Sequence, residues 1–461
     1  MAELSLKEIA AATAGTILAG DPSLSFRTYG IDSREVQSGA LFFAISGARD
    51  GHDFIPDAAA RGAAGAVVSR EFAPPRPGFA LVRVGDTVKA LQALARSVLA
   101  ARRVKVVGIT GSTGKTTTKE FAAALLGARF HVLKSEGNLN NHLGLPLSLL
   151  RLEPHDEVAV LEMGMSAAGE IRVLTAIAPP DIPVITNIHP VHLEFFAGLE
   201  AIALAKKEIL DGARPDGVAV LNADDALVLA IAAGWRGRRV TFGLGAEGDV
   251  RAAGVRVKGY DGLSFELHYG REKAALELPF LSESFLQDFL AAAAVALAMG
   301  LGLADVLTRS TGLAPLAMRG ALAHLAGGVR LLDDSYNSNP KALEDALRHL
   351  VRLPAKRKVA VLADMLELGP EAARFHRQAG RLVCQLGWDI LVAIGPLARE
   401  MAEAAAAEGM PTDSVLTFPD ADAAAARVLD LVRDGDLVLV KGSRAMKTEQ
   451  VVARLKSGRK E

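Results

Sequence analysis

The sequence has one cysteine, few aromatic residues and no excess of charge of either sign, and these shortages exclude several classes of protein. Because Cys384 is the only cysteine in 461 residues, no internal disulfide can form. We expect Cys384 to be a small, buried apolar residue. Lysine and arginine number 52 against 53 acidic residues, which gives a net charge of −1. No basic excess is available to neutralise phosphates, so we expect no nucleic-acid partner.

Long hydrophobic runs are also missing. Apolar stretches such as "FLAAAAVALAMGLGLADVL" are interrupted by Gly and Asp, so we interpret them as buried helices and expect no membrane span. The N-terminal "MAELSLKEIAAATAG" carries acidic residues and lacks the apolar core of a secretory signal. We therefore expect a cytoplasmic protein.

The chain is long enough for two or three hydrophobic cores, and its pattern predicts three α/β domains. Residues 1–84 form a small α/β unit with a Pro-rich loop at 73–78. Residues 85–313 alternate apolar strands with helices, which predicts a parallel sheet covered on both faces, except for an antiparallel hairpin region at 240–280. Residues 314–461 form a second, Rossmann-like α/β domain with four strand candidates.

The segment "GITGSTGKTTTKE" has the character of a phosphate-binding loop between a strand and a helix. The usual pattern is G-x-x-x-x-G-K-[ST], and the chain matches it except at the first glycine, where Ile109 stands. Gly111 and Gly114 still allow the backbone to curl so that its N–H groups point at phosphate oxygens. Lys115 can reach the β- and γ-phosphates, and the hydroxyl of Thr116 can ligate Mg²⁺. We therefore predict ATP binding in a central P-loop domain, and the alternative is an ordinary Gly-rich turn.

Other polar residues follow predicted strands, where ligands bind in such sheets. Glu162 ends "VAVLEMG" and can hold Mg²⁺, although a solvated acid is also common at a strand end. His192 follows the next strand and is a candidate contact for metal or phosphate. The loop "EGNLNNHLG" offers amides to a polar ligand or serves as a capping turn.

In this order, the phosphate loop, the Asn-rich loop, the strand-end Glu and the His-then-Lys segment resemble the Mur ligases. These ATP-dependent amide-forming enzymes build the peptide of bacterial peptidoglycan. The segments "NIHPVHLEFFAGLEAIALAKKEI", "DDSYNSNPKALEDAL", "LADMLELGPEA" and "VLVKGSRAMKTEQVV" are most similar to the member that adds D-alanyl-D-alanine to UDP-N-acetylmuramoyl-tripeptide. The N-terminal "DSREVQSGALFFAISGARDGH" fits as well, so the resemblance covers nearly the whole chain.

The resemblance implies a UDP-sugar domain, a central ATP domain and a C-terminal domain for the incoming amine. It implies that these residues contact ATP: Gly111, Ser112, Thr113, Gly114, Lys115, Thr116, Thr117, Arg319, Asp334, Tyr336 and Asn337. It implies that these contact the UDP-sugar and the amine substrate: Ser33, Arg34, Ser46, Asp50, His52, Lys441, Ser443 and Arg444. The implied ligands of Mg²⁺, as two ions, are Thr116, Glu162, His192 and Lys206.

The implied reaction joins a carboxylate to an amine through an acyl phosphate, with Lys115, Asn138, His192 and Lys206 as the catalytic residues. Lys206 matches a lysine that is carbamylated in several family members, and a carbamate can support a second Mg²⁺. We expect the chain to act as a monomer on UDP-N-acetylmuramoyl-tripeptide and D-alanyl-D-alanine. The sequence leaves open whether the third residue of the tripeptide is lysine or diaminopimelate.

One segment departs from the family pattern, which carries a His and two Asn where the central domain meets adenine. This chain has Ser284, Phe285 and Asp288 there, so we assign no adenine-contacting residues. Two alternatives follow. The chain could be another Mur-type amino-acid ligase, but the "DNPR" expected of the diaminopimelate-adding member is absent. It could also be an inactive nucleotide-binding partner protein, which would have no need of Lys115 and Glu162.

Overall fold

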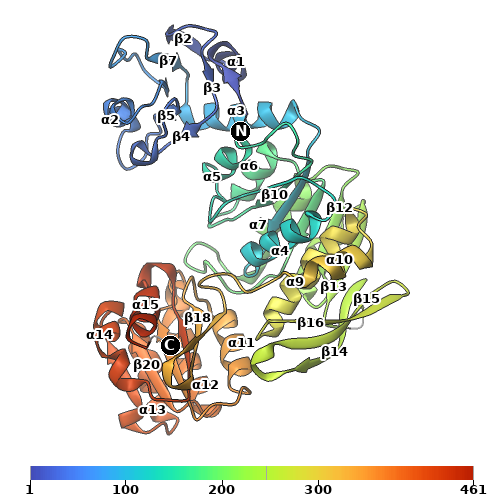
Figure 1. Cartoon of the computed structure of the whole chain (residues 1–461), viewed down its shortest axis with the longest axis vertical. Helices are drawn as coiled ribbons and strands as arrows, with labels where there is room; N and C mark the ends of the chain where they lie inside the picture. Colours follow the sequence, from blue (N-terminus) through green and yellow to red (C-terminus); the bar gives the residue numbers. More distant parts are fainter. Residues whose placement is uncertain (1, 246, 460–461) are drawn as a thin grey trace.

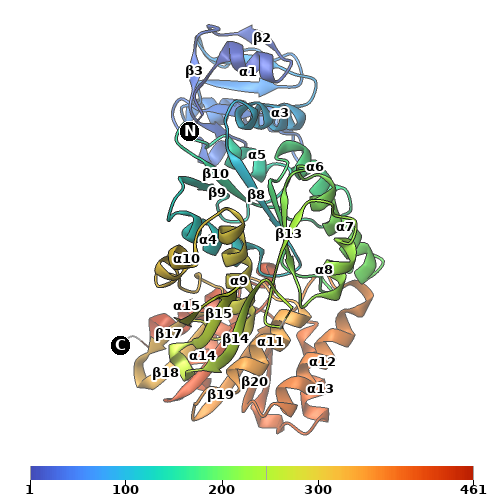
Figure 2. The ribbon, with the colours of Figure 1, turned by 90° about the vertical axis from the view of Figure 1, so that its right-hand side faces the viewer.

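We describe a computed structural model of the chain for residues 2–245 and 247–459. Figures 1 and 2 show an elongated molecule, with the N-terminal residues at one end, the C-terminal residues at the other and a large sheet between them. Three larger sheets lie in succession along the chain and hold five, nine and six strands within the described residues. The α/β fold predicted from the sequence is therefore confirmed.

The first unit is a five-stranded sheet of order β2-β7-β6-β5-β4 beside the small pair β1-β3. Helix α3 follows it and packs against α1 of this unit and α5 of the next. The elements are β1 (Leu4–Ser5), α1 (Leu6–Ala12), β2 (Thr16–Ala19), β3 (Ser25–Phe26), β4 (Tyr29–Gly30), β5 (Leu41–Phe43), α2 (Ile55–Ala60), β6 (Gly65–Val68), β7 (Ala80–Arg83) and α3 (Thr87–Ala100).

The second unit is a nine-stranded sheet of order β16-β15-β14-β13-β12-β11-β8-β10-β9. Its strands are parallel from β9 to β14 and antiparallel from β14 to β16. The elements are β8 (Lys105–Thr110), α4 (Lys115–Leu126), β9 (Val132–Lys134), α5 (Gly144–Leu149), β10 (Val158–Glu162), α6 (Glu170–Ile177), β11 (Ile182–Ile185), α7 (Leu199–Asp211), β12 (Val218–Asn222), α8 (Ala226–Ile231), β13 (Arg238–Gly243), β14 (Val250–Val257), β15 (Leu263–Tyr269), β16 (Glu272–Leu278), α9 (Glu283–Ala298) and α10 (Leu303–Ser310).

The third unit is a six-stranded sheet of order β17-β18-β22-β19-β20-β21, in which only β17 is antiparallel among the described strands. The elements are β17 (Ala321–Leu325), β18 (Val329–Asp334), α11 (Pro340–Leu350), β19 (Arg357–Ala363), α12 (Ala372–Gln385), β20 (Ile390–Ile394), α13 (Ala398–Ala407), β21 (Val415–Phe418), α14 (Ala421–Leu431), β22 (Asp436–Lys441) and α15 (Glu449–Gly458).

Both faces of the central sheet are buried, as its continuous apolar strands predict. In β10, Val158 and Val160 lie in the core formed with α4 and α9. Ala159 and Leu161 point the other way, into the core formed with α5, α6 and α7. Because every strand from β8 to β12 runs in the same direction, their carboxyl ends meet at one edge of the sheet, where the predicted ligand-binding residues lie.

The expectation of four strands in the C-terminal domain was wrong, because β17 and β21 complete the sheet at its two edges. Both are short and half-exposed, so they lack the apolar run that marks an interior strand. The antiparallel region is confirmed for β14 to β16, whereas β13 pairs in parallel with both of its neighbours.

Candidate active site

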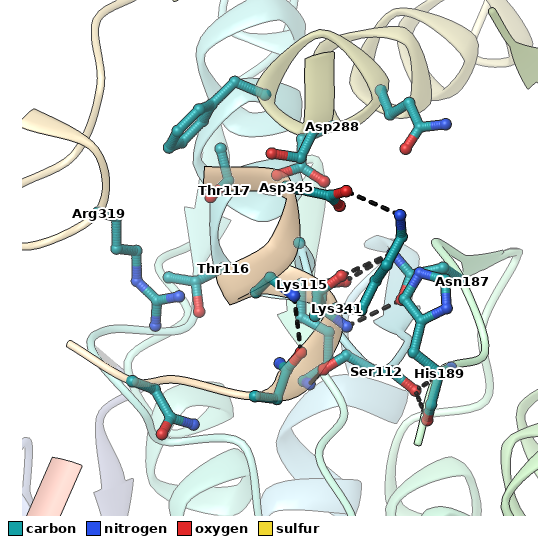
Figure 3. Close-up of a pocket in the computed structure, with 18 of the residues that line it drawn as sticks. Ser112, Lys115, Thr116, Thr117, Asn187, His189, Asp288, Arg319, Lys341 and Asp345 are labelled. Atoms are coloured by element: carbon teal, nitrogen blue, oxygen red, sulfur yellow. Dashed lines mark hydrogen bonds and ion pairs between the residues drawn. The ribbon is translucent and has the colours of Figure 1, made fainter. Parts of the chain in front are cut away.

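A cleft of about 960 Å³ lies between the central and C-terminal domains. The carboxyl-end loops of the central sheet form one wall, and residues of β18, α11 and β22 form the other. Figure 3 shows residues of the phosphate loop, Lys115 and Thr116 among them, in this cleft, together with the ion pair of Lys341 and Asp345 on α11. All of the predicted ATP-loop residues except Gly111 line the cleft, as do Asn138, Glu162 and His192.

The phosphate loop needs its two glycines for space as well as for conformation. Gly111 has φ +154° and Gly114 has φ +79°, which L-residues rarely adopt. A Cβ on Gly111 would lie 1.8 Å from the hydroxyl of Thr186, and one on Gly114 would lie 2.0 Å from a carboxylate oxygen of Asp288. Helix α4 starts at Lys115 directly after Gly114, so its N-terminal N–H groups face the cleft.

Side chains from the end of β11 hold this loop in place. Asn187 accepts a hydrogen bond from the backbone N–H of Thr113 at 2.9 Å and donates to the Thr113 hydroxyl at 2.9 Å. The Thr186 hydroxyl donates to the carbonyl of Thr113 at 2.6 Å. Neither residue was predicted to belong to the site, although "VITNI" places two polar residues at a strand end.

Thr116 and Glu162 meet at the edge of the sheet, as a shared Mg²⁺ site requires. The Thr116 hydroxyl lies 2.8 Å from one oxygen of Glu162, and the side-chain amide of Asn140 donates to the other at 2.8 Å. Mg²⁺ prefers oxygen ligands and usually keeps water and substrate phosphates in its shell, so this sparse pair beside the phosphate loop suits it. No group of three or more His, Cys, Asp or Glu side chains in the described part of the chain forms a denser metal site.

Two lysines of the central domain, the half-buried Lys115 and the buried Lys206, form no ion pair with any carboxylate of the described residues. Burial lowers the pKa of Lys115, and its ammonium donates to the carbonyl of Gly111 at 2.8 Å. Burial also lowers the pKa of Lys206 well below its ordinary value, and the charge of Lys115 lowers it further. The Lys206 side chain is 2% exposed on α7, and it is absent from the lining of the cleft.

Asp288, in the second turn of α9, is a buried acid that packs against Gly114 of the loop. Burial raises its pKa to about 7, against the lowering effect of Arg319. Its neighbours Ser284, Phe285 and Gln287 also line the cleft. The segment that departs from the family pattern is therefore part of the site.

The C-terminal residues predicted to close over ATP form a stacked cluster. The guanidinium of Arg319 lies 3.9 Å from the centre of the Tyr336 ring, and that of Arg444 lies 5.7 Å from it. Arg319 extends toward Thr116 (Figure 3). This cluster brings positive charge to the side of the cleft that faces the phosphate loop.

Lys441 at the end of β22 is also held in this wall. Its ammonium lies 2.5 Å from Asp334 and 3.0 Å from the carbonyl of Asn337, and its side chain is buried. Burial raises the pKa of Asp334, and Lys441 opposes that rise. Ser443 turns away and accepts a hydrogen bond from the backbone N–H of Leu366 at 2.9 Å, so it orders the neighbouring loop.

The five residues predicted to bind the UDP-sugar lie in the N-terminal domain and do not line the cleft. Within that group, one carboxylate oxygen of Asp50 accepts a hydrogen bond from the hydroxyl of Ser46 at 3.0 Å and lies 2.6 Å from Nδ1 of His52. The other ring nitrogen of His52 accepts from the backbone of Ser69 at 3.0 Å, so this buried ring orders the loop. Arg34 is largely exposed and pairs with Asp32, while Ser33 is buried.

Comparison with known proteins gives consistent matches along the chain. Residues 25–99 match the model described as Mur ligase family, catalytic domain, residues 109–296 match Mur ligase middle domain, and residues 318–444 match Mur ligase, glutamate ligase domain. The chain is 35% identical to the UDP-N-acetylmuramoyl-tripeptide–D-alanyl-D-alanine ligase of Bacillus subtilis over 91% of both chains. It is 34% identical to the enzyme of the same name from Escherichia coli over 92% of both.

Solved structures agree over the full length. A crystal structure of MurF from Acinetobacter baumannii matches with a TM-score of 0.90, 30% identity and 99% coverage of each chain. MurF ligase from Thermotoga maritima in complex with ADP matches with a TM-score of 0.82 and 30% identity, covering 94% of this chain and 97% of that one.

Proposed function

Because the chain belongs to the Mur ligase family, we propose that it is an ATP-dependent ligase that joins D-alanyl-D-alanine to UDP-N-acetylmuramoyl-tripeptide. The observation that carries this proposal is the similarity, over nine-tenths of both chains, to relatives named for that reaction. The product would be the pentapeptide precursor of peptidoglycan. The family match and the relative crystallised with ADP support ATP as the energy source.

The cleft has the groups that this chemistry needs. The tripeptide carboxylate attacks the γ-phosphate of ATP and displaces ADP, which gives an acyl phosphate. The amine of D-alanyl-D-alanine then attacks the acyl carbonyl, loses a proton and expels phosphate, which leaves the amide. Charge develops on phosphate oxygens, so the cations Lys115 and Arg319 and the N-terminus of α4 would stabilise it. Asn138, which lines the cleft, would hold the reacting carboxylate.

Mg²⁺ is part of this proposal, as two ions held by Thr116, Glu162, His192 and a carbamylated Lys206. When bound, the ions would neutralise phosphate charge. The 2.8 Å contact between Thr116 and Glu162 supports the first position. Within the described residues, no hydrogen bond or ion pair holds the ammonium of Lys206, and its pKa is lowered.

A lowered pKa favours carbamylation, because only the neutral amine can add to CO₂. A bond then forms between Nζ and the CO₂ carbon, and a proton leaves the nitrogen. The product is a long carboxylate on α7 that can hold a metal or support another ligand.

The amine substrate and the nucleotide-sugar part of the other substrate would bind in the two outer domains. The amine would bind beside Lys441, Ser443 and Arg444, and the nucleotide-sugar beside Arg34 and Asp50. We propose the domain limits 1–84, 85–313 and 314–461, a monomer and a cytoplasmic location. Within the described residues, no helix combines the length and the apolar character that a membrane crossing requires.

The test is phosphate release from ATP by the purified protein with UDP-N-acetylmuramoyl-tripeptide, with and without D-alanyl-D-alanine. Full release is expected only with both substrates, and Lys115→Ala should abolish it. Both the lysine and the diaminopimelate tripeptides are tried, which also identifies the third residue. ATP binding without turnover on either tripeptide would favour a different acceptor or an inactive partner protein.

A further inference from the structure

Two residues with unusual backbone conformations meet between the central and C-terminal domains, beside the cleft that His192 lines. His192 follows β11 in the central domain and Glu367 follows β19 in the C-terminal domain. Both have positive φ, +55° and +63°, which is uncommon and strained for residues other than glycine. Their side chains join at 2.5 Å between Nδ1 of His192 and a carboxylate oxygen of Glu367. Backbone strain of this kind persists only where the surrounding structure enforces it. We therefore interpret the contact as specific to the fold and not as an incidental pair.

The backbones support the same contact. The N–H of Glu194 donates to the carbonyl of Glu367 at 3.2 Å. Gly369, with φ +55°, packs so closely that a Cβ would lie 3.1 Å from the Cα of Glu194. The two segments therefore fit one another along several residues, which an accidental surface pair does not require.

We propose that Glu367 is a positioning residue that fixes the ring of His192 for its work in the cleft when the two domains close. A carboxylate accepts at this distance, so Nδ1 is the donor, and this contact orients Nε2, the other ring nitrogen, as the atom left for a ligand. Histidines that ligate metals commonly donate their other N–H to a carboxylate, which sets the tautomer and the ring orientation. This inference rests on the role of His192 in the proposed function, and it adds a ligand-orienting group from the other domain.

The loop of Glu367 is also joined to the loop expected at the amine substrate. The backbone N–H of Leu366 donates to the Ser443 hydroxyl at 2.9 Å, and the N–H of Ser443 donates to the carbonyl of Asp364 at 3.1 Å. His192 is therefore connected to Ser443 by two hydrogen bonds, one from His192 to Glu367 and one from the neighbouring Leu366 to Ser443. By linkage, a metal at His192 would favour the closed arrangement to the same extent that closure favours the metal.

The alternative is a surface ion pair of little consequence. Glu367 is half exposed, and exposed pairs contribute little to stability. Replacing Glu367 distinguishes the orienting contact from the surface ion pair. A surface pair would leave metal affinity and domain closure unaltered, whereas an orienting group would change both.

The experiment compares Glu367→Ala, Glu367→Gln and the control Glu371→Ala in the full chain. Glu371 is a half-exposed acid on the same loop that pairs with Arg374 inside its own domain. Mn²⁺ affinity is measured by electron paramagnetic resonance with a non-hydrolysable ATP analogue, and the radius of gyration by small-angle scattering. Thermal melting confirms that each variant is folded.

We expect Glu367→Ala to weaken Mn²⁺ binding about tenfold and to enlarge the radius of gyration, while the control matches the wild type. Glu367→Gln keeps an oxygen that accepts from Nδ1–H, so it should bind Mn²⁺ more tightly than the alanine variant. Wild-type affinity in Glu367→Ala, or no gain from glutamine over alanine, would overturn the proposal. A wild-type protein that binds Mn²⁺ and closes but makes no product would contradict the proposed function alone.

Discussion

At the scale of single residues, Asp288 makes the clearest prediction about pH. Burial raises its pKa to about 7 from 3.8, so the folded protein holds a protonated carboxyl where the unfolded chain would ionise. Below the pKa of the unfolded chain, Asp288 is protonated in both the folded and the unfolded state, so its ionisation does not change the stability of the protein. As the pH rises toward 7, ionisation of Asp288 in the unfolded chain lowers the free energy of unfolding. Above pH 7 this destabilisation reaches its full size of about 4 kcal/mol.

Asp288→Asn should therefore stabilise the protein, and by more at high pH. An amide cannot ionise, so the gain in the free energy of unfolding should be about 2–3 kcal/mol larger near pH 8 than near pH 5. Urea unfolding at the two pH values measures this difference. An equal gain at both would show that the carboxyl ionises normally in the folded state.

The same scale shows which site residues the sequence could reveal. Lys115, Thr116 and Glu162 follow from a local pattern, a loop between strand and helix and an acid at a strand end, and the structure places all three at the cleft. Asn140, which bonds Glu162, is two residues from the predicted Asn138, and only the course of the loop distinguishes the two amides. Glu367 could not be predicted, because its contact with His192 depends on how two domains sit together.

At the scale of elements, the start of α4 depends on the space over Gly114. In Gly114→Ala the new Cβ would meet Asp288 at 2.0 Å, and alanine resists φ +79°. We expect loss of ADP binding, measured by calorimetry. Gly127→Ala at the other end of the helix is the control, since its Cβ would lie 3.4 Å from the nearest atoms and its φ is −60°. Equal binding by both variants would contradict the loop geometry.

Lys119 ties α4 to the Asn-rich loop. It is fully buried, and its ammonium donates to the carbonyl of Ser135 at 2.6 Å and pairs with Glu120 at 3.1 Å. Lys119→Met should cost about 1–3 kcal/mol of stability and reduce kcat more than ADP affinity, because the loop that carries Asn138 loses its anchor. Lys134→Met removes the more exposed partner of Glu120 and should change kcat little. Unaltered kcat in Lys119→Met would show that the loop needs no such anchor.

Strands could be predicted from the sequence where nearly all of their residues are buried, because such strands are largely apolar. The strands β8, β10 and β22 have apolar residues along most of their length, and all of their residues except Lys105 are buried in the structure. The edge strands β17 and β21 could not be predicted in this way, because half-exposed strands carry mixed residues and owe their pairing to a neighbour distant in the sequence.

For the whole molecule, alternating strands and helices predicted three α/β units, but not how the units face each other. That arrangement depends on side chains that meet only after each unit has folded, such as Arg319 beside the phosphate loop. The cleft between the central and C-terminal domains is thus a property of the assembled chain, because residues of both domains line it.

The position of the N-terminal domain leads to a prediction about motion. Its candidate residues Arg34 and Asp50 lie outside the cleft, in a unit at the far end of the molecule from the C-terminal domain (Figure 1). In the proposed function, a single substrate would reach from that domain to Lys115, and the amine would approach from the C-terminal side. We expect the domains to close when both ligands bind, because ordered closure excludes water from a reactive acyl phosphate. Small-angle scattering with a non-hydrolysable ATP analogue and UDP-N-acetylmuramoyl-tripeptide should show a smaller radius of gyration than either ligand alone produces. An unchanged radius would mean that the substrate spans a fixed distance between rigid domains, and the reaction would then have to proceed in the arrangement described above.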